Sequence, residues 1–355
     1  MTNEKEVSEL RKEVDLKSMG FEEKMNKVSE LIVQYPRFSE VLKKIEYCHR
    51  VSKFSSEPEC LYVGGTTGAG KTTVSREYAK KYPQIEEGEI TKVPVLMATI
   101  PSPATEKGMV TKILYAIGDP LAETGSKAVQ TIRLMRLIKK CGVELIILDE
   151  FQHFIDRDSE KVLRTVTDWL KVLIEDTGVP LVLLGLNGGS NANHSEIIFD
   201  ANPQLSRRFA NRHTLQPFKF SSAKEIDEFR QFLSMIDMSL PLENRSGLAD
   251  MDMATRFYYA SDGVVAYIMK LIKSGTSMAL QRNEEHLTAD ILTKAFDLHV
   301  RSDKPWKINP FRCSLQEVEK ALQTLEEDEK MASMGANRRL RNVKKAPKAS
   351  EVLRK

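Results

Sequence analysis

Four short apolar runs occupy the middle of the chain, and segments with helical periodicity separate them. Each run is continuously apolar, which is typical of strands in a parallel sheet that is covered on both faces. Two of the separating segments, 129–142 and 161–178, repeat apolar residues at helical spacing and end in glycine, a signal for a helix C-terminus. The runs span residues 60–65, 93–100, 144–150 and 179–186, and we expect a fifth strand at 213–220. This order predicts an α/β domain built on a parallel sheet.

Strand signals stop near residue 221, and only helical patterns follow. The helical segments are 221–236, 249–263, 264–283 and 288–300. Together with the pattern before them, they predict an α/β nucleotide-binding domain over 36–220 and a small α-helical domain over 221–301.

The two ends of the chain differ from its centre. Residues 1–35 are highly charged with a weak apolar period, which predicts an N-terminal extension of one or two amphipathic helices. A further helix is expected beyond Pro36, with Ser39 as its candidate N-cap. Residues 302–355 are predicted to hold a Pro-broken linker, one charged helix and a basic tail. Such a tail is typical of disordered segments that dock on a partner; DNA binding and a purely solubilising role are the alternatives.

Composition sets broad limits on the kind of protein. The 355 residues are 41% hydrophobic and 29% charged, as in a soluble protein with a real core, and the net charge of +3 is too small to identify a partner. No apolar run approaches the roughly 20 residues that span a bilayer. The four cysteines stand far apart without a C-x-x-C pair, which favours reduced thiols over a metal site or disulfides. We therefore expect a cytoplasmic protein that does not associate with membranes.

A glycine-rich stretch after the first apolar run carries the clearest chemical signal. It reads G-T-T-G-A-G-K-T and matches the phosphate-binding pattern G-x-x-x-x-G-K-[ST]. Its glycines allow positive φ and bring N–H groups around phosphate oxygens, and the following helix N-terminus adds partial positive charge. Lys71 reaches the β- and γ-phosphates, and Thr72 offers a hydroxyl to Mg²⁺. The predicted ATP-binding residues are Gly65, Thr66, Thr67, Gly68, Ala69, Gly70, Lys71, Thr72 and Thr73.

Two acidic residues end the third apolar run, and an asparagine follows the fourth. Asp149 and Glu150 follow L-I-I-L, which indicates the second half of a nucleotide hydrolase. Asp149 orders Mg²⁺ through water, and Glu150 polarises the attacking water. Asn187 follows the run at 179–186 and is a candidate sensor of the γ-phosphate, although an asparagine that starts a loop needs no such role.

Arginines cluster just before the expected fifth strand. An arginine delivered from a neighbouring subunit accelerates phosphoryl transfer about 10³–10⁵-fold. The candidates are Arg207, Arg208 and Arg212, of which we favour Arg207 and Arg208. The alternative is a solvated basic helix. A site shared in this way is a heterologous contact, which propagates as a ring or a helix and predicts a homo-oligomer.

The order of these motifs resembles that of an AAA+ ATPase of the initiator-like branch. More closely, K-K-C-G-V-E-L-I-I-L-D-E-F-Q-H-F (139–154) and the run from V-P-L-V-L-L-G to L-S-R-R-F resemble the TnsC/TniB family, the ATPase regulators of DNA transposition. The resemblance covers residues 36 to 300 and implies a P-loop parallel-sheet domain with a helical lid. His153 matches a histidine frequent in the family; a half-buried polar residue with no catalytic role is the alternative.

One position departs from the family pattern. The lid of these ATPases usually offers an arginine toward the phosphates, but here Gly263 is kept and Tyr267 stands where the arginine would fall, with Lys270 one turn further on. This departure puts the sensor role of the lid in doubt. It indicates slow hydrolysis, which suits a regulatory switch.

The resemblance also implies partners. Proteins of this family assemble around double-stranded DNA and connect a target-selection protein to a transposase subunit. The resemblance places contacts to the DNA backbone at Lys107 first, then at Thr124, Ser126 and Lys127. The alternative is that these are solvated loop residues. Two other functions stay open: an ATPase that loads or initiates replication proteins, and an AAA+ switch that works without DNA.

Overall fold

The computed structural model describes residues 18–154 except Ser56, residues 160–186, Phe199, residues 203–325 and Glu327, without the side chains of Phe154 and residues 160–164. The chain divides into two compact units. The sheet unit is Gln34–Pro217, and the helical unit combines Met1–Val33 with Phe218–Lys355.

The sheet unit is built on a parallel sheet, as the apolar runs predict. Its strands among the described residues lie in the order β4-β5-β6-β1-β7, and every neighbouring pair is parallel. Because the strands are parallel, their carboxyl ends share one edge of the sheet. Their bounds are β1 (Leu61–Gly65), β4 (Val95–Thr99), β5 (Leu145–Asp149), β6 (Leu181–Leu186) and β7 (Asn211–Leu215).

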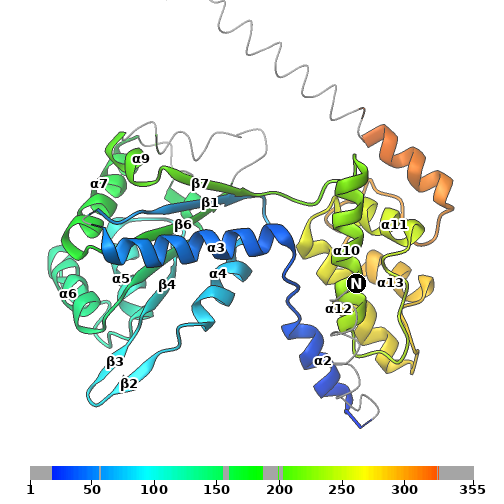
Figure 1. Cartoon of the computed structure of the whole chain (residues 1–355), viewed down its shortest axis with the longest axis horizontal. Helices are drawn as coiled ribbons and strands as arrows, with labels where there is room; N and C mark the ends of the chain where they lie inside the picture. The colour runs from blue at the N-terminus through cyan, green and yellow to red at the C-terminus, as the bar shows by residue number, and fades with distance from the viewer. Residues whose placement is uncertain are drawn as a thin grey trace, which may run out of the picture. The chain divides into compact units, whose positions relative to one another are not determined.

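Helices cover both faces of this sheet (Figure 1). On one face, α3 (Pro36–Val51) contacts β1 and β7, and α4 (Lys71–Lys80) contacts β1 and β4. The other face carries α5 (Glu106–Ala116), α6 (Lys127–Lys140) and α7 (Glu160–Thr177), whose apolar side chains join one core cluster. A short helix, α9 (Pro203–Arg208), precedes β7.

The two covered faces explain why the strands read as continuous apolar runs. Successive side chains of a strand point to opposite faces. In β5, Ile146 and Leu148 enter the cluster under α5 to α7, so Leu145 and Ile147 face α3 and α4. All four side chains are 0% exposed, and each strand therefore needs apolar residues at odd and even positions alike.

Three local features differ from the sequence-based expectation. The fifth strand lies at 211–215 instead of 213–220, because Pro217 has no N–H to continue the ladder. The helix expected beyond Pro36 begins at Pro36 itself, with Tyr35 as N-cap in place of Ser39, since proline is favoured at the first helical position. The antiparallel hairpin of β2 (Ile85–Glu87) and β3 (Ile90–Lys92) was not predicted, and it extends away from the sheet (Figure 1).

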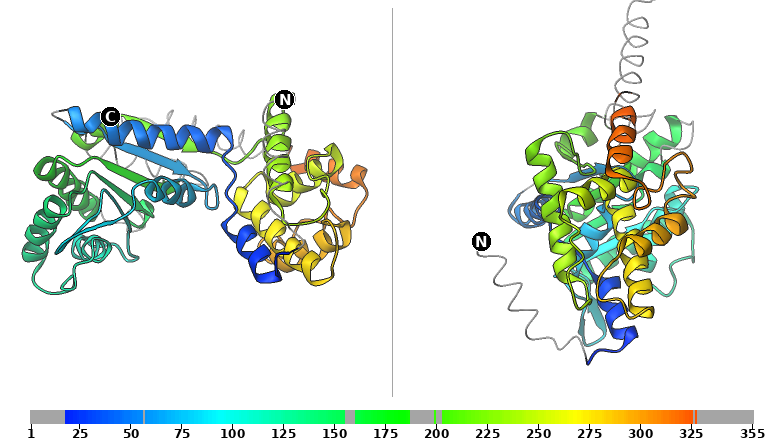
Figure 2. Two further views of the ribbon diagram at one scale, coloured as in Figure 1. Left: turned by 60° about the horizontal axis from the view of Figure 1, so that its bottom comes forward. Right: turned by 90° about the vertical axis from the view of Figure 1, so that its right-hand side faces the viewer.

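The helical unit contains the expected helices. The N-terminal helix α2 (Phe21–Glu30) packs against α12 (Val265–Gln281), and Figures 1 and 2 show this end of the chain beside the helices of its unit. Lys273 of α12 donates a hydrogen bond of 2.8 Å to the Ser29 carbonyl. Any helix before residue 18 lies outside the described residues. The four helices of the segment after residue 221 are α10 (Ala223–Ser239), α11 (Met251–Ser261), α12 (Val265–Gln281) and α13 (Ala289–His299).

The segment after α13 packs against the helical unit. Lys304 and Lys307 are only 7% and 4% exposed, and both pair with Asp262 at the C-terminus of α11. Lys304 Nζ is 2.6 Å from Asp262 Oδ2, and Lys307 also donates to the Tyr259 carbonyl. These ion pairs attach residues 304–307 to the helices. No helix within the described residues has the length and apolar character needed to cross a membrane.

The burial of one histidine predicts that the stability of the sheet unit depends on pH. His49 on α3 is 1% exposed, its Nδ1 is 2.8 Å from Tyr78 Oη, and its Nε2 is 3.0 Å from Glu144 Oε2. Burial lowers the pKa of His49 below its ordinary 6.5, and the hydrogen bond to Glu144 offsets only part of that shift. Below about pH 6.5 the unfolded chain therefore binds this proton more readily, so stability is lost as pH falls.

We expect the melting temperature to fall by a few degrees from about pH 7.5 to about pH 5.5, and His49→Gln to reduce that fall. The exposed His286 provides the matched control, His286→Gln. Glu144 does not interfere, because burial would raise its pKa but hydrogen bonds from Lys53 and His49 hold it below 4.5, outside this range. If differential scanning fluorimetry shows the same dependence of melting temperature on pH for both variants, His49 is not the group responsible.

Candidate active site

The glycine-rich loop connects the end of β1 to the start of α4, at the carboxyl edge of the sheet. Gly65 lies against β7, and a Cβ at this position would meet the Leu215 carbonyl oxygen at 2.5 Å. Gly68 and Gly70 have φ of 79° and 101°, the left-handed region that favours glycine. Gly70 is also the N-cap of α4. The glycines are therefore required by the shape of the loop, which ends on a helix N-terminus.

The lysine of the loop folds back over it. Lys71 Nζ donates to the carbonyls of Gly65 at 2.9 Å and Thr66 at 3.0 Å. Burial lowers the pKa of Lys71, while the charges of Asp149 and Glu150 oppose the shift. Thr66 Oγ1 is buried and has no hydrogen-bond partner among the described residues. A partly buried ammonium beside an unpaired hydroxyl fits an anionic phosphate group.

A threonine and an aspartate supply oxygens beside this loop. Thr72 Oγ1 donates a hydrogen bond of 2.6 Å to Asp149 Oδ2. Asp149, the last residue of β5, is only 3% exposed. A hydroxyl and a carboxylate are the hard oxygen ligands that Mg²⁺ prefers. The residues present therefore fit ATP with Mg²⁺: Thr72 and Asp149 would hold the ion, and Lys71 with the loop N–H groups would hold the phosphates.

Glu150 is held in an unusual conformation directly after β5. Its φ is 60°, and its N–H donates to Asp149 Oδ1 at 2.8 Å. A non-glycine residue with such a φ is uncommon and is found where surrounding contacts fix it, often at functional sites. Its carboxylate accepts a hydrogen bond from Gln152 Nε2, although the side chain remains 42% exposed. The carboxylate is thus positioned and still accessible.

Gln152 was missed by sequence reasoning. It is 8% exposed, and nothing in its spacing marks it, because a glutamine two residues after an acid is common in any loop. His153 Nδ1 lies 3.1 Å from the Ile100 carbonyl oxygen, and its Nε2 lies 4.0 Å from Glu150 Oε2. The histidine therefore connects the end of β4 to the neighbourhood of Glu150. Asn187 lies outside the described residues.

The comparisons with known proteins identify the family and the fold of this chain. A family model described as "Bacterial TniB protein" matches residues 26–220, more than half of the chain. The chain belongs to the TniB family. No curated protein matches the sequence significantly.

Solved structures similar to this TniB-family chain show the fold of AAA+ ATPases. The Aeropyrum pernix ORC1 protein, solved in complex with DNA, is 18% identical with a TM-score of 0.51, over 74% of this chain and 65% of that one. The Aeropyrum pernix ORC2 protein, solved in ADPNP and ADP complexes, is 16% identical with a TM-score of 0.54, over 79% and 72%. CDC6P from Pyrobaculum aerophilum is 14% identical with a TM-score of 0.52, over 76% and 69%. At these identities the likeness shows the fold.

The arginines of the TniB-family chain lie at the opposite edge of the sheet. Arg207 and Arg208 end α9, and Arg212 is the second residue of β7. Because β7 is parallel to β1, its first residues align with the start of β1, while the glycine-rich loop follows the end of β1. The structure therefore does not bring these arginines to the P-loop of their own chain.

The residues predicted to contact DNA come together at two neighbouring helix N-termini. Thr105 caps α5 through a 3.0 Å bond from the Gly108 N–H, and Ser126 caps α6 through a 3.4 Å bond from the Val129 N–H. Lys127 pairs with Glu106 across the two helices, whereas no carboxylate among the described residues forms an ion pair with Lys107. All four predicted residues, Lys107, Thr124, Ser126 and Lys127, are exposed.

Tyr267 stands where a lid arginine is expected, and its contacts are with other residues of the helical unit. The Lys304 ammonium lies 4.1 Å from the centroid of the Tyr267 ring, and the Lys270 ammonium lies 5.3 Å from the same centroid. Lys270 Nζ is also 3.5 Å from Asp303 Oδ2. Both side chains thus contribute to holding the segment after α13.

Proposed function

We propose that this TniB-family protein is an ATP-dependent regulator of DNA transposition that oligomerises on double-stranded DNA. The observation that carries the proposal is the meeting of the glycine-rich loop, the Thr72–Asp149 pair and the positioned Glu150 at one edge of the sheet. The family membership supports transposition as the process.

The side chains at this edge support hydrolysis of ATP to ADP and phosphate. Lys71 and the loop N–H groups bind the phosphates and neutralise their charge. Mg²⁺, when bound through Thr72 and Asp149, would withdraw charge from the phosphate oxygens. Glu150 orients a water molecule and accepts its proton, and Asn187 senses the γ-phosphate and aligns that water. Tyr267 in place of the lid arginine supports slow, regulatory turnover.

A second subunit completes the proposed site. The arginines at the amino edge of the sheet, Arg207 or Arg208, would reach the nucleotide of a neighbouring copy and stabilise the transferring phosphoryl group. Such a contact uses two different surfaces of the same chain, and repeated contacts of this kind form a ring or a helical filament. ATP binding and assembly would therefore depend on each other.

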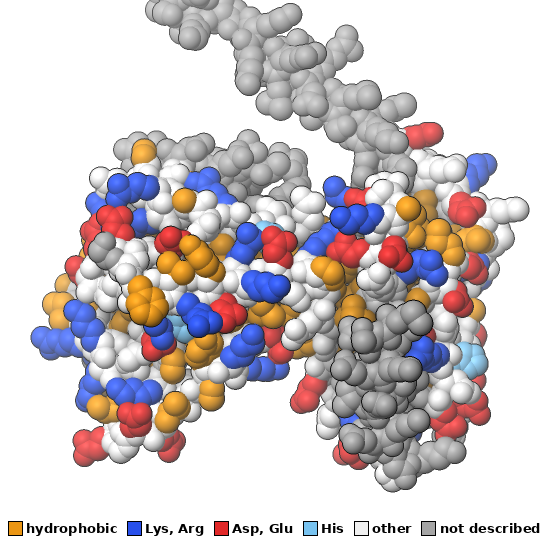
Figure 3. Space-filling view, viewed as in Figure 1, with side chains coloured by type: hydrophobic (Ala, Val, Ile, Leu, Met, Phe, Trp, Pro, Cys, Tyr) orange, Lys and Arg blue, Asp and Glu red, His pale blue; other side chains and the backbone are white. Residues whose placement is uncertain are grey.

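DNA would bind along the α5 and α6 N-termini of the assembled subunits. Backbone N–H groups at a helix N-terminus attract phosphate, and Lys107 adds a positive charge. Basic and acidic side chains are interspersed among the described residues of the face drawn in Figure 3. The net charge of the whole chain is +3, which supports only weak attraction to DNA per subunit. When many subunits bind one duplex, these weak backbone contacts would add up to tight binding without recognition of the base sequence. The assembled protein would then link a target-selection protein to a transposase subunit, with the basic tail at 337–355 as a docking arm outside the described residues.

Electron microscopy of the purified chain with a non-hydrolysable ATP analogue tests the proposal. We expect regular rings or filaments with duplex DNA and the analogue, and none with DNA and ADP. Equal assembly with and without DNA would favour a DNA-independent switch. The absence of assembly under every condition would contradict the proposal.

Replacing Lys107 by alanine tests the DNA surface. We expect equally weaker binding to unrelated duplex sequences, and a slope of log affinity against log salt that shrinks by about 1 per subunit, because one fewer counterion is released. ATP binding without DNA should not change. The matched control is Lys139→Ala, another exposed lysine at the far end of α6. Equal salt slopes for the two variants, measured by fluorescence anisotropy, would move the DNA contacts elsewhere.

A further inference from the structure

The three arginines near β7 differ sharply in their surroundings. The Arg208 side chain is only 11% exposed and pairs with Glu175 at 3.0 Å. Arg212 donates to the Phe209 carbonyl and to Ser206 Oγ, and its guanidinium lies 4.2 Å from the Phe199 ring centroid. Both therefore contribute to the fold of their own subunit. The Arg207 side chain, in contrast, is 73% exposed.

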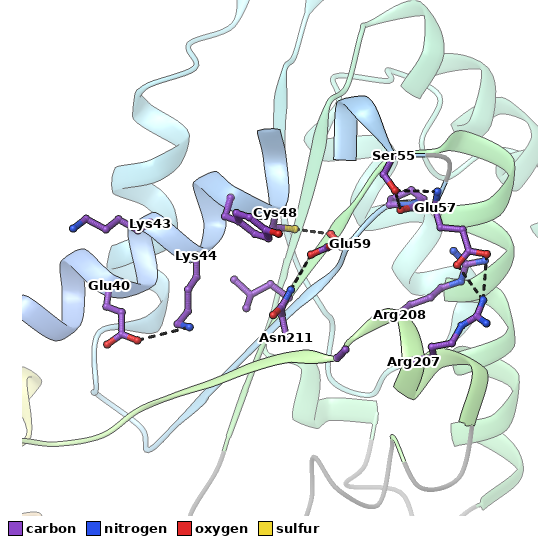
Figure 4. A pocket seen from close by; sticks show the side chains of 14 residues that line it. Glu40, Lys43, Lys44, Cys48, Ser55, Glu57, Glu59, Arg207, Arg208 and Asn211 are labelled. Atoms are coloured by element: carbon purple, nitrogen blue, oxygen red, sulfur yellow. Dashed lines mark hydrogen bonds and ion pairs between the residues drawn. The ribbon is translucent and has the colours of Figure 1, made fainter. Parts of the chain in front are cut away.

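Arg207 is held by one carboxylate. Its Nη2 donates to both oxygens of Glu57, at 3.0 Å and 3.2 Å (Figure 4). Glu57 lies in a turn that Ser55 stabilises, because Ser55 Oγ donates to the Glu57 carbonyl at 2.6 Å and accepts from its N–H at 3.3 Å. The Glu57 side chain is 59% exposed, so water and a competing anion can reach this ion pair.

Arg207 cannot serve the nucleotide of its own subunit. Glu57 precedes β1 by four residues, and the glycine-rich loop follows the end of β1. A strand of five residues spans about 13 Å from first to last Cα. The Cys60 N–H donates to the Arg208 carbonyl at 3.1 Å, so the Arg207–Glu57 pair lies near the start of β1, about one strand length from the loop that carries Lys71. A nucleotide that Arg207 touches therefore belongs to another molecule.

The surface around this pair has the character of a subunit contact. A groove of about 900 Å³ runs beside it, lined by Lys43, Lys44 and Tyr47 of α3 and by Asn211 of β7, among others (Figure 4). Phe54 is 92% exposed and lies three residues before Glu57. Exposed aromatic and arginine side chains are enriched at the centres of protein interfaces.

We infer that Arg207 is the arginine delivered to a second copy of this chain, and that Glu57 holds it in the free subunit and releases it on docking. The inference rests on the proposed shared ATPase site. A bound triphosphate carries more negative charge than one carboxylate, so Arg207 exchanges Glu57 for the neighbour's phosphate when the subunits meet. The exposed Phe54 ring, three residues before Glu57, would add apolar contact on docking.

A mixing experiment tests the assignment of Arg207. The single variants Arg207→Ala and Arg208→Ala are each measured for DNA-dependent ATPase activity, alone and mixed with Lys71→Ala protein. We expect Arg207→Ala to lose about 10³-fold or more in rate while binding ATP normally, and to recover activity in the mixture. Because Arg207 is exposed, its variant should keep the parent melting temperature.

The outcomes separate the inference from the function on which it rests. Full activity of Arg207→Ala together with a folded, inactive Arg208→Ala would overturn the inference and leave the shared site intact. Full activity of both variants would overturn the shared site as well. A loss of activity in Arg207→Ala that the mixture does not restore at any ratio would also overturn delivery to a second copy.

Glu57→Gln tests the release step. Exposed ion pairs are weak, so the variant should reach half-maximal ATPase at a protein concentration about two- to fivefold lower than the parent, with an unchanged rate at saturation. Phe54→Ala should reach half-maximal ATPase activity only at a higher protein concentration than the parent. The matched control is Glu46→Gln, which breaks the exposed Glu46–Arg50 pair outside the groove. If Glu57→Gln and Glu46→Gln behave alike, Glu57 does not restrain Arg207.

Discussion

Lys71→Ala should bind ATP about a hundredfold or more weakly than the parent protein and should fail to assemble on DNA. Hydrogen bonds to charged groups contribute about 1.5–3 kcal/mol each. Removing two such bonds to the β- and γ-phosphates therefore weakens binding by at least about two orders of magnitude. Assembly should fail with it, because the neighbour's arginine then has no triphosphate to contact.

The fold of the sheet unit should survive this change. In the structure Lys71 Nζ donates only to two carbonyls of its own loop, at 2.9 Å and 3.0 Å, among the described residues. Lys80→Ala, an exposed lysine at the far end of α4, is the matched control. Calorimetric titration with ATP gives the affinity, and a parent-like Kd for Lys71→Ala would contradict the assignment of the phosphate site.

The nucleotide edge could be predicted because its chemistry is local in the sequence. The glycine-rich loop is contiguous, and its helix follows immediately at Lys71. Asp149 and Glu150 could be placed near it because parallel strands bring their carboxyl ends to one edge. The apolar runs predicted the strands themselves, since burial on both faces requires apolar residues throughout.

Contacts between distant residues could not be predicted in this way. Glu57 and Arg207 are 150 positions apart in the chain, and nothing in either segment indicates their pairing. The three arginines look equivalent in the sequence, and their contacts with Glu57, Glu175 and Phe199 help to distinguish them in the structure. The order of strands, with β6 between β1 and β5, likewise depends on tertiary packing.

Short polar features could not be predicted from the sequence either. The hairpin of β2 and β3 has exposed residues throughout β2, so no apolar pattern indicates it. The segment at 304–307 reads as a linker because of Pro305 and its two lysines. Its lysines are nevertheless buried, since Asp262 ends α11 with φ of 52° and presents its carboxylate to both. Buried lysines are rare without such a partner.

Glu150→Gln should bind ATP normally but hydrolyse it about 10²–10⁴-fold more slowly, and its DNA assemblies should last correspondingly longer. The glutamine keeps the shape of the side chain and its contact with Gln152, but it cannot accept a proton from water. The contrast with Lys71→Ala follows from position, because Lys71 belongs to the loop that binds phosphate and Glu150 lies beyond it at the end of β5.

Lys71→Ala and Glu150→Gln together distinguish the role of ATP binding from that of ATP hydrolysis. Assemblies of the Glu150→Gln protein with ATP should resemble those that the parent forms with a non-hydrolysable analogue, when both are followed by light scattering after dilution. The exposed Glu123 gives a control, Glu123→Gln, in the same sheet unit. Hydrolysis by Glu150→Gln at the parent rate would show that another group activates the water. Rapid disassembly despite blocked hydrolysis would instead contradict the expectation that ATP hydrolysis limits the lifetime of the DNA assemblies.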